Sequence, residues 1–151
     1  MREQRLIKGF TPPTSENNLI HTMSSADREL IEPHQTPVKL PKRMVLEEPG
    51  EPISRVYFLR SGVGSTVAMI ENGRPIEVGL FGHEGMSGTA IVMQSEYSTQ
   101  RTFMQIAGDG WSIDAKRLRD LLEQSTSLQR HLLRYVQTLM TQVSHTALSN
   151  G

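Results

Sequence analysis

Short apolar runs separated by turn-forming residues fill the middle of the chain. Seven of these runs predict strands, over residues 36–40, 44–46, 56–60, 64–70, 75–80, 101–106 and 110–113. Asn72-Gly73 lies between two of the runs and favours a tight hairpin. Ten of the twelve glycines lie between Gly50 and Gly110, and all eight prolines lie at or before Pro75. Many short strands at close spacing favour a jelly roll, a sandwich or a small barrel.

Residues 111–150 contain neither glycine nor proline, and their apolar positions follow a helical period. This pattern predicts a helix over residues 114–123, capped by Asp114, and a long helix over residues 128–147. The long helix carries two neighbouring apolar stripes, whereas one stripe is enough to cover a β-roll. A second copy across a two-fold axis would cover the other stripe. The alternative is one broad stripe buried in its own domain. The candidate dimer-interface residues are Leu128, Leu132, Tyr135, Val136, Leu139, Met140 and Val143.

The polar N-terminal segment, residues 1–18, has no period and is predicted to be a flexible arm. Ser24-x-x-Asp27 resembles a capping box, and it predicts a helix from about Ser25 to Pro33, after a helical turn near residues 19–23. Residues 82–90 are glycine-rich and then apolar, which indicates a loop that opens a short helix.

The charge balance of the chain argues against direct binding to nucleic acid. Lys plus Arg and Asp plus Glu each number 16, so the net charge is zero, whereas nucleic-acid binders usually carry a basic excess. The absence of cysteine excludes disulfides and thiolate metal sites. There is no apolar run of about 18 residues and no apolar leader, so we expect a cytoplasmic protein that does not contact a membrane.

Three segments in this order resemble the effector domain of the Crp/Fnr family of bacterial transcription regulators. They are EPGEPISRVYFLRSG at 48–62, IEVGLFGHEGMSG at 76–88 and LLRYVQTLM at 132–140. The resemblance implies a mainly β fold with some α: a double-stranded β-helix, or jelly roll, like that of cyclic-nucleotide-binding domains. Short helices would precede it and a long C-terminal dimerisation helix would follow it.

The resemblance also implies a division of the chain and a function. Residues 1–18 would be the arm, 19–126 the β-roll effector domain and 127–151 the dimerisation helix, which leads to a helix-turn-helix domain absent from this chain. We expect the sensing and dimerisation part of a transcription regulator. It would form a homodimer, bind an unknown small-molecule effector, and contact DNA only through the absent helix-turn-helix domain.

The glycine-rich segment would then be the ligand cassette. By resemblance the candidate ligand-binding residues are Gly88, Thr89, Ala90, Arg101, Thr102 and Ser144. Thr89 stands where the family's cyclic-nucleotide binders have a ribose-binding glutamate, and Val143-Ser144 replaces a Thr-Ser pair that reads the base. Arg101 either faces the pocket or lies in solvent. We therefore expect no cyclic-nucleotide binding by the usual route. The free amides of the cassette would meet another anion or the protein's own acidic groups.

The remaining candidates for chemistry have simpler explanations. The five histidines lack metal-ligand spacing, and His83 is expected in solvent. Trp111, Met86 and Met93 are expected in the core, and Glu47-Glu48 on a solvated turn. No enzyme motif is present, so we expect neither catalysis nor a cofactor. The alternatives are a stand-alone cyclic-nucleotide-binding module and a cupin-type metalloenzyme, which bound metal and turnover would reveal.

Overall fold

The computed structural model describes residues 17–69 and 72–150. The helices are α1 (Asn18–His21), α2 (Ser25–Ile31), α3 (Thr89–Val92), α4 (Ala115–Gln124) and α5 (Thr126–Asn150), with a 3-10 turn, η1 (Glu32–His34), after α2. The strands are β1 (Thr36–Leu40), β2 (Val45–Glu47), β3 (Arg55–Leu59), β4 (Val63–Met69), β5 (Pro75–Phe81), β6 (Arg101–Ile106) and β7 (Gly108–Asp114).

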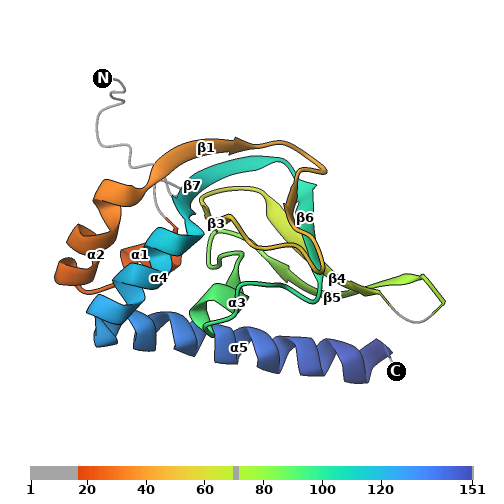
Figure 1. The fold of residues 1–151 in the computed structure, drawn as a ribbon. Helices are drawn as coiled ribbons and strands as arrows, with labels where there is room; N and C mark the ends of the chain where they lie inside the picture. The colour runs from red at the N-terminus through yellow and green to blue at the C-terminus, as the bar shows by residue number, and fades with distance from the viewer. Residues whose placement is uncertain (1–16, 70–71, 151) are drawn as a thin grey trace, which may run out of the picture.

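The strands form two antiparallel sheets that face each other as a β-roll. One sheet has the order β1-β7-β3 and the other β2-β6-β4-β5. Helices α1, α2 and α4 gather at one end of the roll, and α5 runs along its side with α3 between the two (Figure 1). This is the mixed jelly roll with a long C-terminal helix that the sequence predicts.

Apolar side chains fill two separate cores. The smaller core lies between the two sheets and consists of Leu40, Leu46, Leu59, Phe81 and Met104. The larger core lies where the helices meet β3 and β7, with Phe58, Ile113, Leu118 and Leu128 all fully buried. The helices are therefore held by the same apolar surface that the roll presents at its end.

Polar caps fix where the helices begin. The Ser24 side chain accepts from the Asp27 backbone N–H at 3.1 Å at the start of α2, and the Asp114 side chain accepts from the Arg117 N–H at 3.1 Å at the start of α4. Both caps follow the predicted pattern. The predicted flexible arm, residues 1–18, is wrong at Asn17 and Asn18. Asn17 is fully buried and caps α1, and Asn18 is the first residue of that helix. Residues 1–16 lie outside the described part of the chain.

The long helix α5 divides its apolar side chains between two surroundings. Leu128, Leu132 and Val136 are buried in the chain's own core. Leu133 and Met140 are 39% and 58% exposed, so the single chain leaves that stripe uncovered. Val143, another candidate interface residue, has a side chain outside the described part.

Two local predictions are wrong. Met93, expected in the core, is 50% exposed at the C-terminal end of α3, whereas Met86 is buried as expected. Glu47, expected on a solvated turn, lies in β2 and is 9% exposed. The hairpin predicted at Asn72-Gly73 joins β4 to β5, with Gly73 at a φ of +81°, but part of its turn lies outside the described residues.

Candidate ligand-sensing site

A cavity of about 50 Å³ lies between the second sheet, the loop before α3 and helix α5. Its walls combine hydroxyl and amide groups, one carboxylate and three apolar side chains. The lining residues are Glu47, Thr66, Gly79, Phe81, Met86, Ser87, Thr89, Ser98, Gln100, Thr102 and Leu139. This volume suits a few water molecules, while pockets for drug-sized ligands span roughly 300–1,000 Å³. The cavity is therefore closed to a nucleotide in this conformation.

The cassette before α3 is held in place by pairing with β3. The Ser87 hydroxyl accepts from the Tyr57 N–H at 2.9 Å, and the Ser87 N–H donates to the Tyr57 carbonyl, also at 2.9 Å. Gly88 then turns the chain with a φ of +74°, where a Cβ would also lie 2.6 Å from Val56 Cγ2. Only glycine satisfies both conditions at low cost, which explains this residue at the start of α3.

Glu47 enters the cavity because β2 carries a bulge. The pairing of β2 with β6 slips between Val45 and Glu47, so that three residues of β2 span two of β6. A bulge breaks the alternation of side chains, and Leu46 and Glu47 consequently both face inward while Val45 is exposed. Alternation alone would have placed adjacent residues on opposite faces.

The Glu47 carboxylate meets the backbone of the cassette. The Gly88 N–H donates to Glu47 Oε2 at 2.5 Å, and the Ser98 side chain lines the same cavity. Burial raises the pKa of the Glu47 carboxyl above its ordinary value, and the hydrogen bond from the Gly88 N–H only partly opposes this effect. The cassette amide thus already has an acidic partner within the chain, which is one of the two partners expected from the sequence.

The other predicted ligand-binding residues divide into three groups. Thr89 and Thr102 line the cavity, and the Thr102 hydroxyl lies 3.2 Å from that of Thr66. Ala90 is half-buried and packs on the larger core. Arg101 is exposed and its Nε donates to Glu48 Oε1 at 3.0 Å, so it belongs to a surface ion pair and does not line the cavity.

Helix α5 reaches the site through two side chains. Leu139 forms part of the cavity wall. The Tyr135 ring packs on Gly85, at the start of the cassette, and burial raises the pKa of its phenol. Ser144, the last predicted contact, lies on an exposed part of α5 and is not brought to the cavity.

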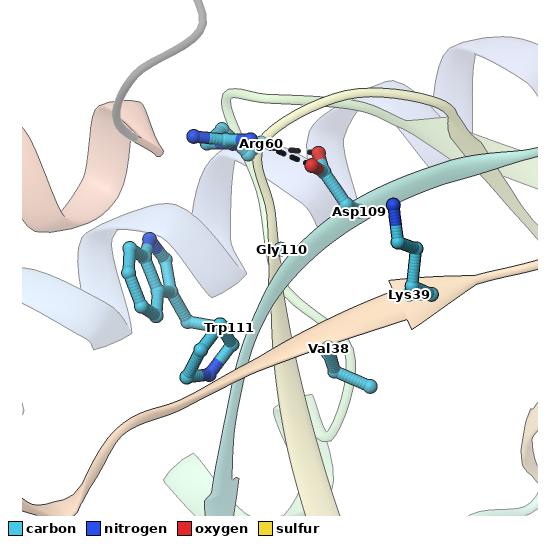
Figure 2. Close-up of a pocket in the computed structure, with 7 residues that line it drawn as sticks. Val38, Lys39, Arg60, Asp109, Gly110 and Trp111 are labelled. Atoms are coloured by element: carbon cyan, nitrogen blue, oxygen red, sulfur yellow. Dashed lines mark hydrogen bonds and ion pairs between the residues drawn. The ribbon is translucent and has the colours of Figure 1, made fainter. Parts of the chain in front are cut away.

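A larger hollow of about 240 Å³ lies on the face of the β1-β7-β3 sheet that carries Trp111 and Asp109 (Figure 2). Arg60 Nη2 and Asp109 Oδ2 pair there at 2.6 Å, and the bond from Arg60 holds the pKa of the Asp109 carboxyl below its ordinary value. Trp111 is half-buried and packs on the larger core, as expected. The hollow surrounds the Arg60–Asp109 ion pair and touches neither the cassette nor α5, so it is not the site that the cassette predicts.

No protein-family model and no curated protein sequence matches the chain. Solved structures do match it. The sensor domain of the transcriptional regulator DNR from Pseudomonas aeruginosa superposes with a TM-score of 0.63 at 17% identity, over 80% of this chain and 81% of that one. A Crp/Fnr-family regulator from Eubacterium rectale gives 0.70 at 16% identity, over 83% and 59%. The fold is that of Crp/Fnr sensor domains.

A cyclic nucleotide-binding domain from Methylobacillus flagellatus has the same fold, with a TM-score of 0.68 and 13% identity over 89% of this chain and 79% of that one. At these identities the likeness to Crp/Fnr sensor domains concerns the fold alone. The chain spans about three-fifths of the Eubacterium rectale regulator. Among the described residues no helix is long and apolar enough to cross a membrane, and no three acidic or histidine side chains are grouped to hold a metal ion.

Proposed function

We propose that the chain is the ligand-sensing and dimerisation part of a Crp/Fnr-type transcription regulator in the cytoplasm. One observation carries the proposal: Leu139, on the long helix α5, forms part of the wall of the cassette cavity. A small molecule in that cavity would therefore contact the same helix that leaves the domain. A sensing site built directly against an output helix is typical of an allosteric regulator.

The proposed signal passes from the cassette to α5 by packing. Tyr135 lies against Gly85 and Leu139 against the cavity, so two side chains of one helix follow any movement of the cassette. Packed cores change between discrete arrangements. Occupation of the cavity would thus alter the angle or register of α5 and, with it, the spacing of DNA-binding domains outside this chain.

The proposed dimer uses the stripe of α5 that the single chain leaves exposed. Leu133 and Met140 lie on this stripe. The β4-β5 hairpin projects along the C-terminal half of α5 (Figure 1). It also carries exposed apolar side chains, namely Met69, Ile76 and Leu80. A two-fold pairing of α5 would cover Leu133 and Met140 in both copies.

The proposal can be tested by fusing the chain, through α5, to a DNA-binding domain that recognises its operator only as a dimer. We expect repression of a reporter gene. Met140→Glu should lower operator binding at least ~tenfold, because burying a charge in an apolar seam costs several kcal/mol. Thr141→Glu is the control, since the next residue lies about 100° around the helix. A fusion that fails to repress, or equal loss in both variants, would contradict the proposal.

A further inference from the structure

Glu47 is the one charged side chain among the described residues that line the cassette cavity. It is 9% exposed, and no Lys, Arg or His accompanies it on the described cavity wall. Arg101, which precedes the cavity residue Thr102 in β6, is exposed and pairs with Glu48 at 3.0 Å. No cationic side chain on the described wall therefore balances the Glu47 carboxylate.

The remaining groups on the wall do not reverse this polarity. The Gly88 amide, the donor best placed for an incoming anion, already donates to Glu47 Oε2 at 2.5 Å. The Thr66 and Thr102 hydroxyls lie 3.2 Å apart, where one can donate to the other. Hydroxyls both donate and accept, so they satisfy a neutral or cationic guest as well as they satisfy an anion.

We propose that Glu47 determines the specificity of the sensing site by excluding anions, so that the effector is a small neutral or cationic molecule carrying hydrogen-bond donors. The inference rests on the proposed sensing function and narrows its ligand class. An anion in the cavity would face a like charge in a medium of low dielectric, and it would have to displace the carboxylate to reach the Gly88 amide. A donor group would instead find a carboxylate oxygen.

The test follows the backbone amides of Gly88 and Thr89 by NMR in the ¹⁵N-labelled chain during addition of inorganic phosphate at constant ionic strength. The wild type should show no saturable shift of these amides. Glu47→Ala should show a saturable shift. Its phosphate concentration at half-saturation should be at least ~tenfold below the value, or the lower limit, found for the wild type, because a hydrogen bond to a charged group is worth about that factor or more. Glu48→Gln removes a charge from the next residue and should behave as the wild type.

Each outcome decides the proposal. Equal phosphate responses in the wild type and Glu47→Ala would overturn the proposal. The absence of a saturable shift in both proteins would also overturn it, because Glu47 would then not be the group that excludes the anion. If Glu47→Ala does not fold, Glu47→Gln keeps the side-chain shape and one acceptor oxygen, and it should still lower the midpoint by removing the like charge. The reporter fusion measures dimerisation independently of the cavity, so failure of this inference and failure of the proposed function are distinguishable.

Discussion

Gly85 and Tyr135 illustrate how single residues join the cassette to α5. A Cβ at position 85 would clash with the Tyr135 hydroxyl and lie 3.1 Å from the Phe81 Cβ. We predict that Gly85→Ala lowers the free energy of unfolding by about 1–3 kcal/mol, the usual cost of overpacking. Urea denaturation of the variant and the wild type measures this difference.

Tyr135→Phe provides the matched test of the same contact. The Tyr135 hydroxyl is buried and forms no hydrogen bond of standard geometry within the described residues, so its removal should change stability by less than about 1 kcal/mol. In the Gly85→Ala background, however, Tyr135→Phe should restore part of the lost unfolding free energy, because it removes the hydroxyl oxygen with which the new methyl group clashes. If the two changes in unfolding free energy were strictly additive, there would be no steric interaction between positions 85 and 135.

Glu47 should give the stability of the protein a distinctive pH dependence. Burial raises the pKa of this carboxyl above the ordinary 4.5, so the folded state binds its proton more tightly than the unfolded chain does. The resulting stability is present below pH 4.5 and is lost as the pH rises through the folded-state value. Relative to Glu47→Gln, the wild type should therefore be more stable at about pH 4.5 than at pH 7.5. Parallel unfolding curves at both pH values check this, and a constant difference would contradict it.

Among the elements, α2 is tied to the junction of α4 and α5 by one buried carboxylate. Asp27 is 4% exposed and accepts from the Ser125 and Ser127 hydroxyls, each at 2.6 Å. The Ser125 hydroxyl in turn accepts from the Leu128 N–H at 3.0 Å in the first turn of α5. We predict that Asp27→Ala destabilises the fold by about 1–3 kcal/mol, because it removes the two hydrogen bonds to a charged group that tie α2 to this junction. Glu29→Ala, an exposed acid on the same helix, should have little effect in the same thermal or urea unfolding.

The acid sensitivity of this junction has the opposite sign to that of Glu47. Burial alone would raise the pKa of Asp27, but the bonds from the Ser125, Ser127 and Ser24 side chains outweigh it and leave the pKa below 3.8. Its contribution is therefore present above pH 3.8 and is lost as the pH falls through the lowered value. In Asp27→Ala, the unfolding midpoint should vary less with pH over this acid range. An unchanged acid dependence would show that Asp27 carries no such contribution.

The strands and helices could be predicted closely because their signals are local. β1 and β6 have the predicted bounds, and Asp114 starts α4 as its capping pattern indicates. Glu47 could not be placed in this way, since its burial depends on a bulge against β6 and on an amide from a distant loop. The sequence offers two acidic residues before a Pro-Gly turn, a pattern typical of solvated loops. Arg101 was likewise undecided, because only the fold brings Glu48 beside it.

At the scale of the whole molecule, helix α5 both packs in the larger core and lines the cassette cavity, and it uses different side chains for each role. Leu128, Leu132 and Val136 anchor the helix in the larger core. Leu139 is the link to the cavity. The sequence pattern predicts these four residues at the dimer interface together with Tyr135, Met140 and Val143, but a helical period does not tell which neighbour covers which face. Leu133 and Met140 are exposed, and they are the side chains that the proposed second copy would cover.

This division predicts different outcomes for charges placed on the two faces of α5. The wild-type chain should sediment as a dimer at micromolar concentration. Leu133→Glu should sediment as a folded monomer, because its charge enters only the seam between copies, where desolvation costs several kcal/mol. Leu139→Glu should instead lower the free energy of unfolding, since it adds a second carboxylate to a closed cavity that already holds Glu47. Thr141→Glu should alter neither property. A monomeric wild type would refute the two-fold pairing, and a dimer that survives Leu133→Glu would assign the seam to another face of the helix.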